Sequence, residues 1–267
     1  MTTRREFLER FGAGLVVMLV SHDATAMTSG QPFGGPSLSP DDNEAAAEQI
    51  GAWLHIDANG MVTVYTGKVE FGQGIRTSLA QQVAEELRVP MSSVHMVMGD
   101  TDLTPFDMGT FGSMSTPQMG SKLRTVSAAT RDLLVGLAAK KWKVSAAALT
   151  AADGRVVDSR SQRSISYGEL VAGRRLTEIV PDQANLAPAD KWKVAGTSVP
   201  IVGARDIVTG KHKYTSDMTL PGMLIGKVVR PTHYGATLAK FDSGTATSLP
   251  GVIVTSQGDF AGVAAPT

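Results

Sequence analysis

The sequence contains no cysteine. Disulfide bonds, zinc sites with thiolate ligands, iron–sulfur ligation and a cysteine nucleophile are therefore excluded within these 267 residues. An excess of charge of either sign is also missing, because 25 Lys and Arg residues balance 25 Asp and Glu residues. Without a basic field to attract phosphates, nucleic acid is not expected as a partner.

Long apolar runs are missing as well. The run GAGLVVMLV, residues 12–20, is far shorter than the about 20 residues that span a bilayer, so no transmembrane span is expected in the mature chain. Arg4 and Arg5 precede this run, and Ala24-Thr25-Ala26 follows it with the small-x-small pattern of a signal-peptidase site. RREFL resembles a twin-arginine export signal, with a basic N-terminal helix as the alternative. The sequence predicts a signal peptide over residues 1–26 and a periplasmic protein.

The first half of the chain carries clear secondary-structure patterns. Residues 27–50 are rich in Pro, Gly and Ser and then acidic, which predicts a flexible linker. Alternating apolar residues on both sides of Asn59-Gly60 predict a hairpin. A helix is predicted to end before Pro90. Its apolar residues recur every four positions, at Ile75, Leu79, Val83 and Leu87, which leaves Glu85, Glu86 and Arg88 on a solvated side.

The remaining patterns predict an α+β fold. Residues 92–101 read as a strand, and a loop of about 20 residues follows, a length that usually indicates a functional loop. A second long helix follows Pro117, with a hairpin and a short helix capped by Ser166 after it. From residue 200 the chain is β-rich with one short helix. The predicted parts are a signal peptide at 1–26, a linker at 27–50, an N-terminal segment of strands and two longer helices at 51–199, and a C-terminal part at 200–267.

Gly72-Gln73-Gly74 lies between the end of a predicted strand and the start of the first helix. Glycines let a backbone approach a ligand closely, and a helix beginning near Ile75 would direct unpaired N–H groups toward an anion. The spacing is GxGxxT, and no Lys-Ser/Thr pair follows, so neither a dinucleotide fingerprint nor a P-loop is matched. A plain turn is the alternative.

The long loop contains the run Gly109 to Thr116, GTFGSMST, which is rich in hydroxyls and small residues. Such residues can hold a phosphate or a pterin edge, although an ordinary polar loop has the same composition. If the second helix faces the first, two helix N-termini would converge. The five histidines show no metal-ligand spacing. Turn formation is the favoured interpretation of the loop carboxylates Asp100, Asp102 and Asp107.

Together these residues resemble a known family. Gly67, Glu70, Gly72, Gln73, Gly74 and Thr77, followed by Thr110, Ser113 and Ser115, resemble the molybdopterin-binding large subunit of the xanthine dehydrogenase/aldehyde oxidase family. The stretch from residue 203 onward resembles the α/β-hammerhead domain of that family. An E-x-GQG segment ahead of the hammerhead is the order found in isoquinoline 1-oxidoreductase beta subunits.

The resemblance implies a molybdenum hydroxylase, which oxidatively hydroxylates an N-heteroaromatic compound or an aldehyde with water as the oxygen source. It also implies a molybdenum–molybdopterin cytosine dinucleotide cofactor and a small partner subunit whose [2Fe–2S] clusters carry the electrons away. A cytochrome c is a candidate acceptor. The residues carried over as cofactor contacts are Gly72, Gln73, Gly74, Gly112, Ser113 and Ser115.

One feature departs from the family. The base glutamate of the family lies in a G-E-x-x segment near the C-terminus, and this sequence has no such segment there. We therefore expect a truncated large subunit with no catalytic residue and no metal ligand of its own. Two other classes stay open. A nicotinamide or flavin oxidoreductase could use Gly72 and Gly74, although the third glycine and the ribose-binding acid are missing. A non-catalytic periplasmic binding or assembly module is the second.

Overall fold

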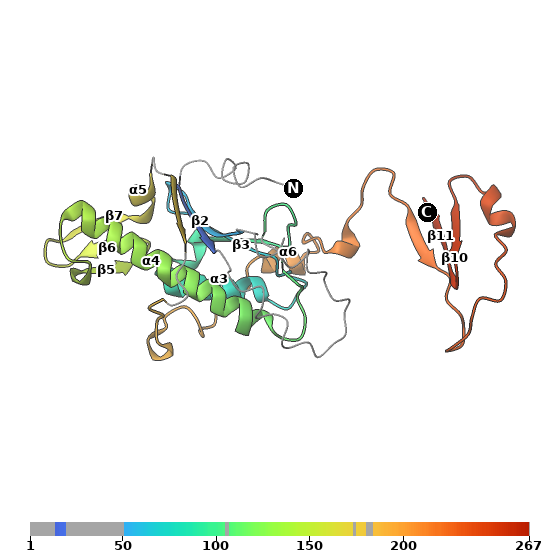
Figure 1. The fold of residues 1–267 in the computed structure, drawn as a ribbon, viewed down its shortest axis with the longest axis horizontal. Coiled ribbons are helices and arrows are strands. Elements are labelled where there is room, and N and C mark those ends of the chain that lie inside the picture. The colour runs from blue at the N-terminus through green and yellow to red at the C-terminus, as the bar shows by residue number, and fades with distance from the viewer. Residues whose placement is uncertain (1–13, 20–50, 105–106, 173–174, 180–183, 267) are drawn as a thin grey trace. The chain divides into compact units, whose positions relative to one another are not determined.

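The computed structural model describes residues 14–19, 51–104, 107–172, 175–179 and 184–266 (Figure 1). The predicted linker and most of the predicted signal peptide lie outside these residues. The chain divides into two compact units between Ile207 and Val208. The predicted division into a signal peptide, a linker, an N-terminal segment and a C-terminal part stays a prediction.

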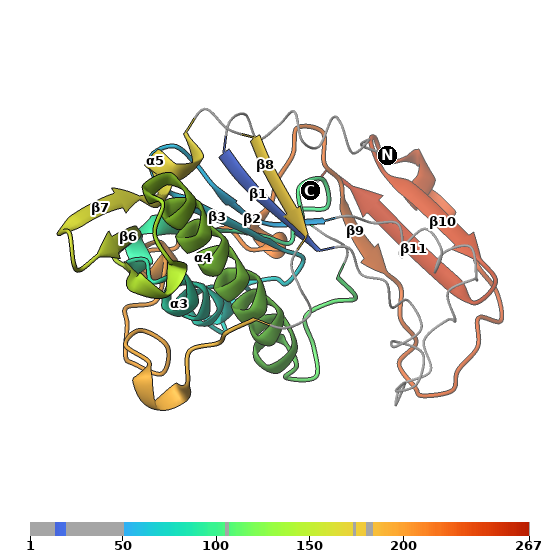
Figure 2. The same cartoon turned by 60° about the vertical axis from the view of Figure 1, so that its left-hand side comes forward.

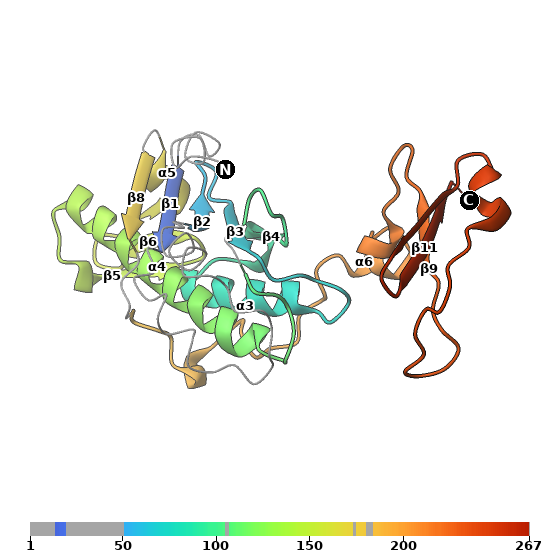
Figure 3. The ribbon, with the colours of Figure 1, turned by 45° about the vertical axis from the view of Figure 1, so that its right-hand side comes forward.

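A five-stranded sheet forms the centre of the first unit, in the order β4-β3-β2-β1-β8 (Figure 3). Strands β2 (Gly51–Ile56) and β3 (Val62–Thr66) form the predicted antiparallel hairpin. Strand β4 (Val94–Met98) pairs parallel to β3, and helix α3 (Ile75–Leu87) connects the two. The two segments that leave the carboxyl ends of β3 and β4 therefore start at the same edge of the sheet.

Strand β1 (Gly14–Leu19) comes from the apolar run predicted as the core of a signal peptide. It pairs antiparallel with β2 and parallel with β8 (Arg175–Ile179). The arginine pair and the cleavage pattern of the predicted signal lie outside the described residues. The export signal therefore stays a prediction.

Two long helices pack against each other beside the sheet (Figure 2). Helix α3 begins at Ile75 and ends before Pro90, as predicted, and the residue after it, Arg88, has a φ of 57°, the left-handed conformation common at helix C-termini. Helix α4 (Ser121–Trp142) continues from a π-helical turn at Ser115–Gly120, so helical structure begins inside the predicted loop. The apolar side of α4 faces the core: Leu123, Val126 and Leu134 are fully buried, and Leu133 and Leu137 are partly buried.

The predicted solvated face of α3 is wrong for its two glutamates, because Glu85 is 2% exposed and Glu86 is fully buried. A later segment of the chain lies against them. Glu85 accepts hydrogen bonds from the backbone N–H groups of Lys193, Val194 and Ala195, at 2.6–3.2 Å. A polar stripe on a helix faces solvent only when no distant segment packs against it. In α3 the segment around Lys193 to Ala195 packs against this stripe.

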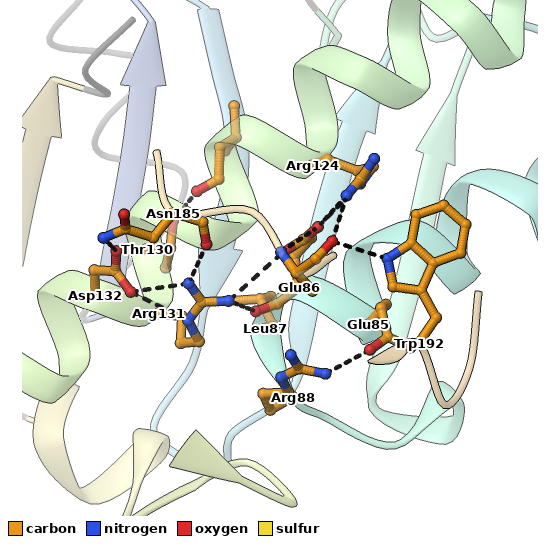
Figure 4. A network of polar contacts seen from close by, with 12 residues as sticks. Glu85, Glu86, Leu87, Arg88, Arg124, Thr130, Arg131, Asp132, Asn185 and Trp192 are labelled. Atoms are coloured by element: carbon orange, nitrogen blue, oxygen red, sulfur yellow. Dashed lines mark hydrogen bonds and ion pairs between the residues drawn. The ribbon is translucent and has the colours of Figure 1, made fainter. Parts of the chain in front are cut away.

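Glu86 lies at the centre of a polar network between α3 and α4 (Figure 4). Its Oε1 is 2.8 Å from a guanidinium nitrogen of Arg124, and its Oε2 is 3.5 Å from one of Arg131. The backbone N–H of Ala187 donates to the same carboxylate at 3.0 Å. The buried charge is therefore paired and hydrogen-bonded, as burial of a carboxylate requires.

A smaller antiparallel sheet packs near the end of α4 and confirms a predicted hairpin. It contains β5 (Leu149–Ala152), β6 (Arg155–Asp158) and β7 (Arg163–Ser166). Helix α5 (Tyr167–Val171) follows at once. Its predicted cap is confirmed, because Ser166 and Glu169 form a reciprocal capping box.

The second unit contains a three-stranded antiparallel sheet, in the order β10-β11-β9, and a short 3₁₀ helix at Gly244–Ser248. Its strands are β9 (Ile225–Val228), β10 (Ile253–Gln257) and β11 (Phe260–Ala265), and the short α6 (Ala204–Val208) precedes it. Mixed helices and strands confirm the α+β class. Among the described residues, no helix combines the length and the apolar composition needed to cross a bilayer.

Candidate functional site

The glycine–glutamine loop and the hydroxyl-rich loop lie together in the first unit. They follow β3 and β4, which are parallel neighbours, so the topology brings them to one edge of the sheet. Lys68 Nζ donates to Asp107 Oδ1 at 2.7 Å and to the carbonyl oxygen of Gly109 at 2.6 Å. The backbone N–H of Val69 donates to Thr110 Oγ1 at 2.8 Å. The glycine–glutamine loop and the hydroxyl-rich loop are therefore directly bonded to each other.

Glu70 holds the glycine–glutamine loop from inside. Its carboxylate accepts hydrogen bonds from the N–H groups of Gly72 (2.8 Å), Gly74 (3.0 Å) and Arg76 (2.9 Å). Burial acts to raise the pKa of Glu70, but these three donors outweigh it and lower the pKa below its ordinary value. At the start of α3 the N–H of Arg76 is therefore taken by the chain's own carboxylate, as are those of Gly72 and Gly74 ahead of the helix.

Gln73 is also bonded within its loop. Its Nε2 donates to the carbonyl oxygen of Val69 at 2.9 Å, and its Oε1 accepts from the N–H of Phe71 at 2.8 Å. The flanking Gly72 and Gly74 have φ values of 107° and 81°, which other residues rarely adopt. The loop conformation therefore depends on the glycines, and a contact of Gln73 with a cofactor stays a prediction.

The hydroxyl-rich loop offers donors that are not already used. Ser113 has a φ of 57°, an uncommon conformation for serine, and it follows Gly112 at 63°. Ser115 opens the helical turn before α4, and no side chain caps that turn. Within the described part of the chain neither hydroxyl has a hydrogen-bond partner. The hydroxyl of the exposed Ser113 and that of the buried Ser115 therefore lie near the positive end of a helix.

These two loops fit a cofactor that combines a flat ring system with phosphates. The hydroxyls and N–H groups near Ser113 and Ser115 suit phosphate oxygens or a pterin edge. Large apolar side chains lie exposed on the same loops and suit a ring face. These are Val69, Phe71, Met108, Phe111 and Met114.

Two residues of the site have roles that the sequence pattern does not predict. Lys68 carries only a weak signal, a lysine directly after an apolar strand, which can indicate a buried partner. Asp107 was predicted to form a turn, and it does accept the N–H of Gly109 at 2.9 Å, but it also pairs with Lys68. Thr77 accepts the N–H of Val202 at 2.9 Å and so serves the fold. Among the described residues, no group of three metal-binding side chains gathers in one place.

A family model described as the molybdopterin cofactor-binding domain matches residues 23–216. This chain belongs to that family. The resemblance to molybdopterin-binding subunits of the xanthine dehydrogenase/aldehyde oxidase family is thereby confirmed. A nicotinate dehydrogenase subunit of Pseudomonas putida is 34% identical over 88% of this chain and 20% of its own length. The beta subunit of isoquinoline 1-oxidoreductase from Brevundimonas diminuta is 30% identical over 86% of this chain and 35% of its own length.

The chain thus spans well under half the length of these curated relatives. Among solved structures, quinoline 2-oxidoreductase from Pseudomonas putida 86 aligns with a TM-score of 0.40 and 28% identity. That alignment covers 44% of this chain and 15% of the solved one.

The buried Glu85 predicts a loss of stability in acid. Burial acts to raise its pKa, but hydrogen bonds from Val194, Lys193 and Ala195 and the charge of Arg88 lower the pKa below its ordinary value. A lowered folded-state pKa stabilises the fold above the unfolded value of about 4.3, and this contribution is lost as the pH falls through the folded value. Glu85→Gln should therefore lower stability at pH 7 and weaken its decline below about pH 5.

Urea unfolding followed between pH 7 and pH 3 measures this effect. Asp190→Asn, which removes an exposed carboxylate, is the control and should leave the pH dependence as it is. An unchanged decline in Glu85→Gln would contradict the assignment.

Proposed function

We propose that this chain is part of the large subunit of a molybdenum hydroxylase and forms one half of its cofactor site. The observation that carries the proposal is the direct bonding of the glycine–glutamine loop to the hydroxyl-rich loop by Lys68 and Val69. Both loops lie within the residues matched to the molybdopterin cofactor-binding domain. The proposed reaction is oxidative hydroxylation with water as the oxygen source.

N-heteroaromatic compounds are the proposed substrates, with aldehydes as the second class. Two relatives are named for nicotinate and isoquinoline, which are both N-heteroaromatic, and this supports the first class. When bound, the molybdenum cofactor supplies the two-electron redox chemistry. The residues of this chain bind and orient it. Ser113 and Ser115 donate hydrogen bonds to the pterin or its phosphates, with Gly112 allowing close approach, while Gly72, Gln73 and Gly74 lie near the metal.

The full-length protein would supply what this chain does not contain. A base glutamate is proposed in the remaining polypeptide, and the second unit is proposed as the start of an α/β-hammerhead domain. A small subunit with [2Fe–2S] clusters is the proposed electron carrier, since the chain has no cysteine to ligate a cluster. A cytochrome c is the proposed acceptor, the cofactor is proposed in its cytosine dinucleotide form, and the periplasm is the proposed location.

Elemental analysis of the purified full-length protein tests the proposal, combined with identification of the nucleotide that acid hydrolysis releases. Molybdenum together with a cytosine nucleotide is the expected result. NAD or a flavin would instead support a nicotinamide or flavin oxidoreductase. A protein that binds neither would support a non-catalytic binding or assembly module.

Gln73→Ala should reduce molybdenum retention or turnover by about 10- to 100-fold, the range found for residues that support a metal site. The fold should survive, because Gln73 is exposed and its two hydrogen bonds are local. Molybdenum content, turnover and thermal unfolding of the full-length protein are the measurements. Gln257→Ala, an exposed glutamine in β10, is the matched control. Unchanged metal content and rate in Gln73→Ala would remove Gln73 from the site.

A further inference from the structure

Lys68 and Asp107 form a buried ion pair that the proposed chemistry does not use. Their side chains are 9% and 7% exposed, and Nζ lies 2.7 Å from Oδ1. Both groups are also bonded to Gly109, since its carbonyl oxygen accepts from Lys68 and its N–H donates to Asp107. The pair is thus fully embedded where the two loops meet.

Global stability is a weak reason for such a pair. Removing two charges from water is costly, and buried ion pairs can often be replaced by apolar residues without loss of stability. Hydrogen bonds are directional, however, whereas apolar contacts tolerate sliding. Lys68 bonds to Asp107 and Gly109, and Val69 bonds to Thr110. Together these bonds fix the position of one loop relative to the other.

This placement extends to the residues proposed to hold the cofactor. Val69 is followed by Glu70, whose carboxylate fixes the N–H groups of Gly72 and Gly74. On the other side, Thr110 is two residues ahead of Gly112. A continuous series of short bonds therefore links the glycine–glutamine loop to the hydroxyl-rich loop.

We propose that Lys68 and Asp107 are positioning residues that fix the spacing between the two loops that this chain contributes to the cofactor site. The inference rests on the proposed function. It assigns the pair a task distinct from folding, because the fold can do without the charges while the spacing cannot. Thr110 is the third member of the same connection, through its hydroxyl.

The double variant Lys68→Met/Asp107→Leu separates these two roles. It removes both charges together, so neither is left buried without a partner, and thermal unfolding should stay close to that of the wild type. Molybdenum should leave the full-length protein about 10- to 100-fold faster during dialysis, the range found for outer-shell partners of metal sites. Lys68→Arg, which keeps the ion pair, should restore most of the retention. Lys122→Met, an exposed lysine at the start of α4, is the control.

The inference is overturned if the double variant retains molybdenum as the wild type does. It is also overturned if the double variant loses molybdenum only in proportion to a lower Tm and Lys68→Arg does not restore molybdenum retention. Should the double variant fail to fold, Thr110→Val decides, because it removes one hydroxyl acceptor and leaves the ion pair. Faster metal loss in Thr110→Val supports the inference, and wild-type retention overturns it. A wild-type protein without molybdenum would instead refute the proposed function.

Discussion

Glu86→Gln is expected to lower the free energy of unfolding by about 3–5 kcal/mol, the usual result of removing one partner from a buried ion network. The wild-type carboxylate is fully buried, and Arg124 and Arg131 of α4 are within ion-pair distance of it. A neutral amide would leave the partly buried guanidinium of Arg124 without its carboxylate partner, and Arg131 with Asp132 alone. Its NH₂ group would also face donors on at least one side, including the N–H of Ala187.

Urea unfolding at pH 7 measures the loss. Glu169→Gln is the matched control, because Glu169 lies at the exposed end of the capping box and makes local bonds. The control should show only a small loss, because a glutamine at this position can still complete the capping box. A loss of that same size in Glu86→Gln would show that the network contributes little.

Gly168→Ala should destabilise the protein by at least about 1–3 kcal/mol, the usual cost of overpacking, although alanine is the better helix former. Gly168 lies in α5 against the turn between β2 and β3. A Cβ there would lie 2.2 Å from the carbonyl oxygen of Ala58 and 2.8 Å from the N of Gly60. Both are backbone atoms, so no side-chain rotation relieves the clash.

Gly136→Ala in α4 is the control for Gly168→Ala. No atom lies within 4 Å of the Cβ that would be added there. Helix propensity then acts alone, and a gain of about 0.5–1 kcal/mol is expected. Thermal unfolding of both variants should give shifts of opposite sign. An increase in Tm for both would show that α5 and the hairpin turn are not in close contact.

Local patterns predicted the elements of the fold well because their causes are local. Asn59-Gly60 fixed the expected hairpin turn, and Ser166 with Glu169 fixed the start of α5. The covered face of α3 was not predictable in this way. Thr77, Gln81 and Glu85 recur every four residues, as a solvated polar stripe would, but all three bind a segment more than 100 residues later, between Lys193 and Val202.

In the candidate site, too, local features were predictable from the sequence and long-range contacts were not. Residue types indicated the two loops, because glycines and small hydroxyl residues leave room for a ligand. The contacts that join the loops depend on the parallel pairing of β3 and β4, and Lys68 reaches 39 residues along the chain to Asp107. The role of Glu70 was also hidden, since a carboxylate near glycines does not show by itself that it occupies their N–H groups.

The segment from Lys193 to Val202, which covers one face of α3, has a consequence for folding during synthesis. Glu85 and Glu86 take backbone donors that lie 101 to 110 residues further along the chain. These contacts cannot form until Ala195 has left the ribosomal exit tunnel. Before then, both carboxylates lack these backbone hydrogen-bond donors. Contacts of such long sequence separation also form late and slowly in refolding. The helix that begins at the glycine–glutamine loop therefore reaches its final environment only at the end of domain synthesis.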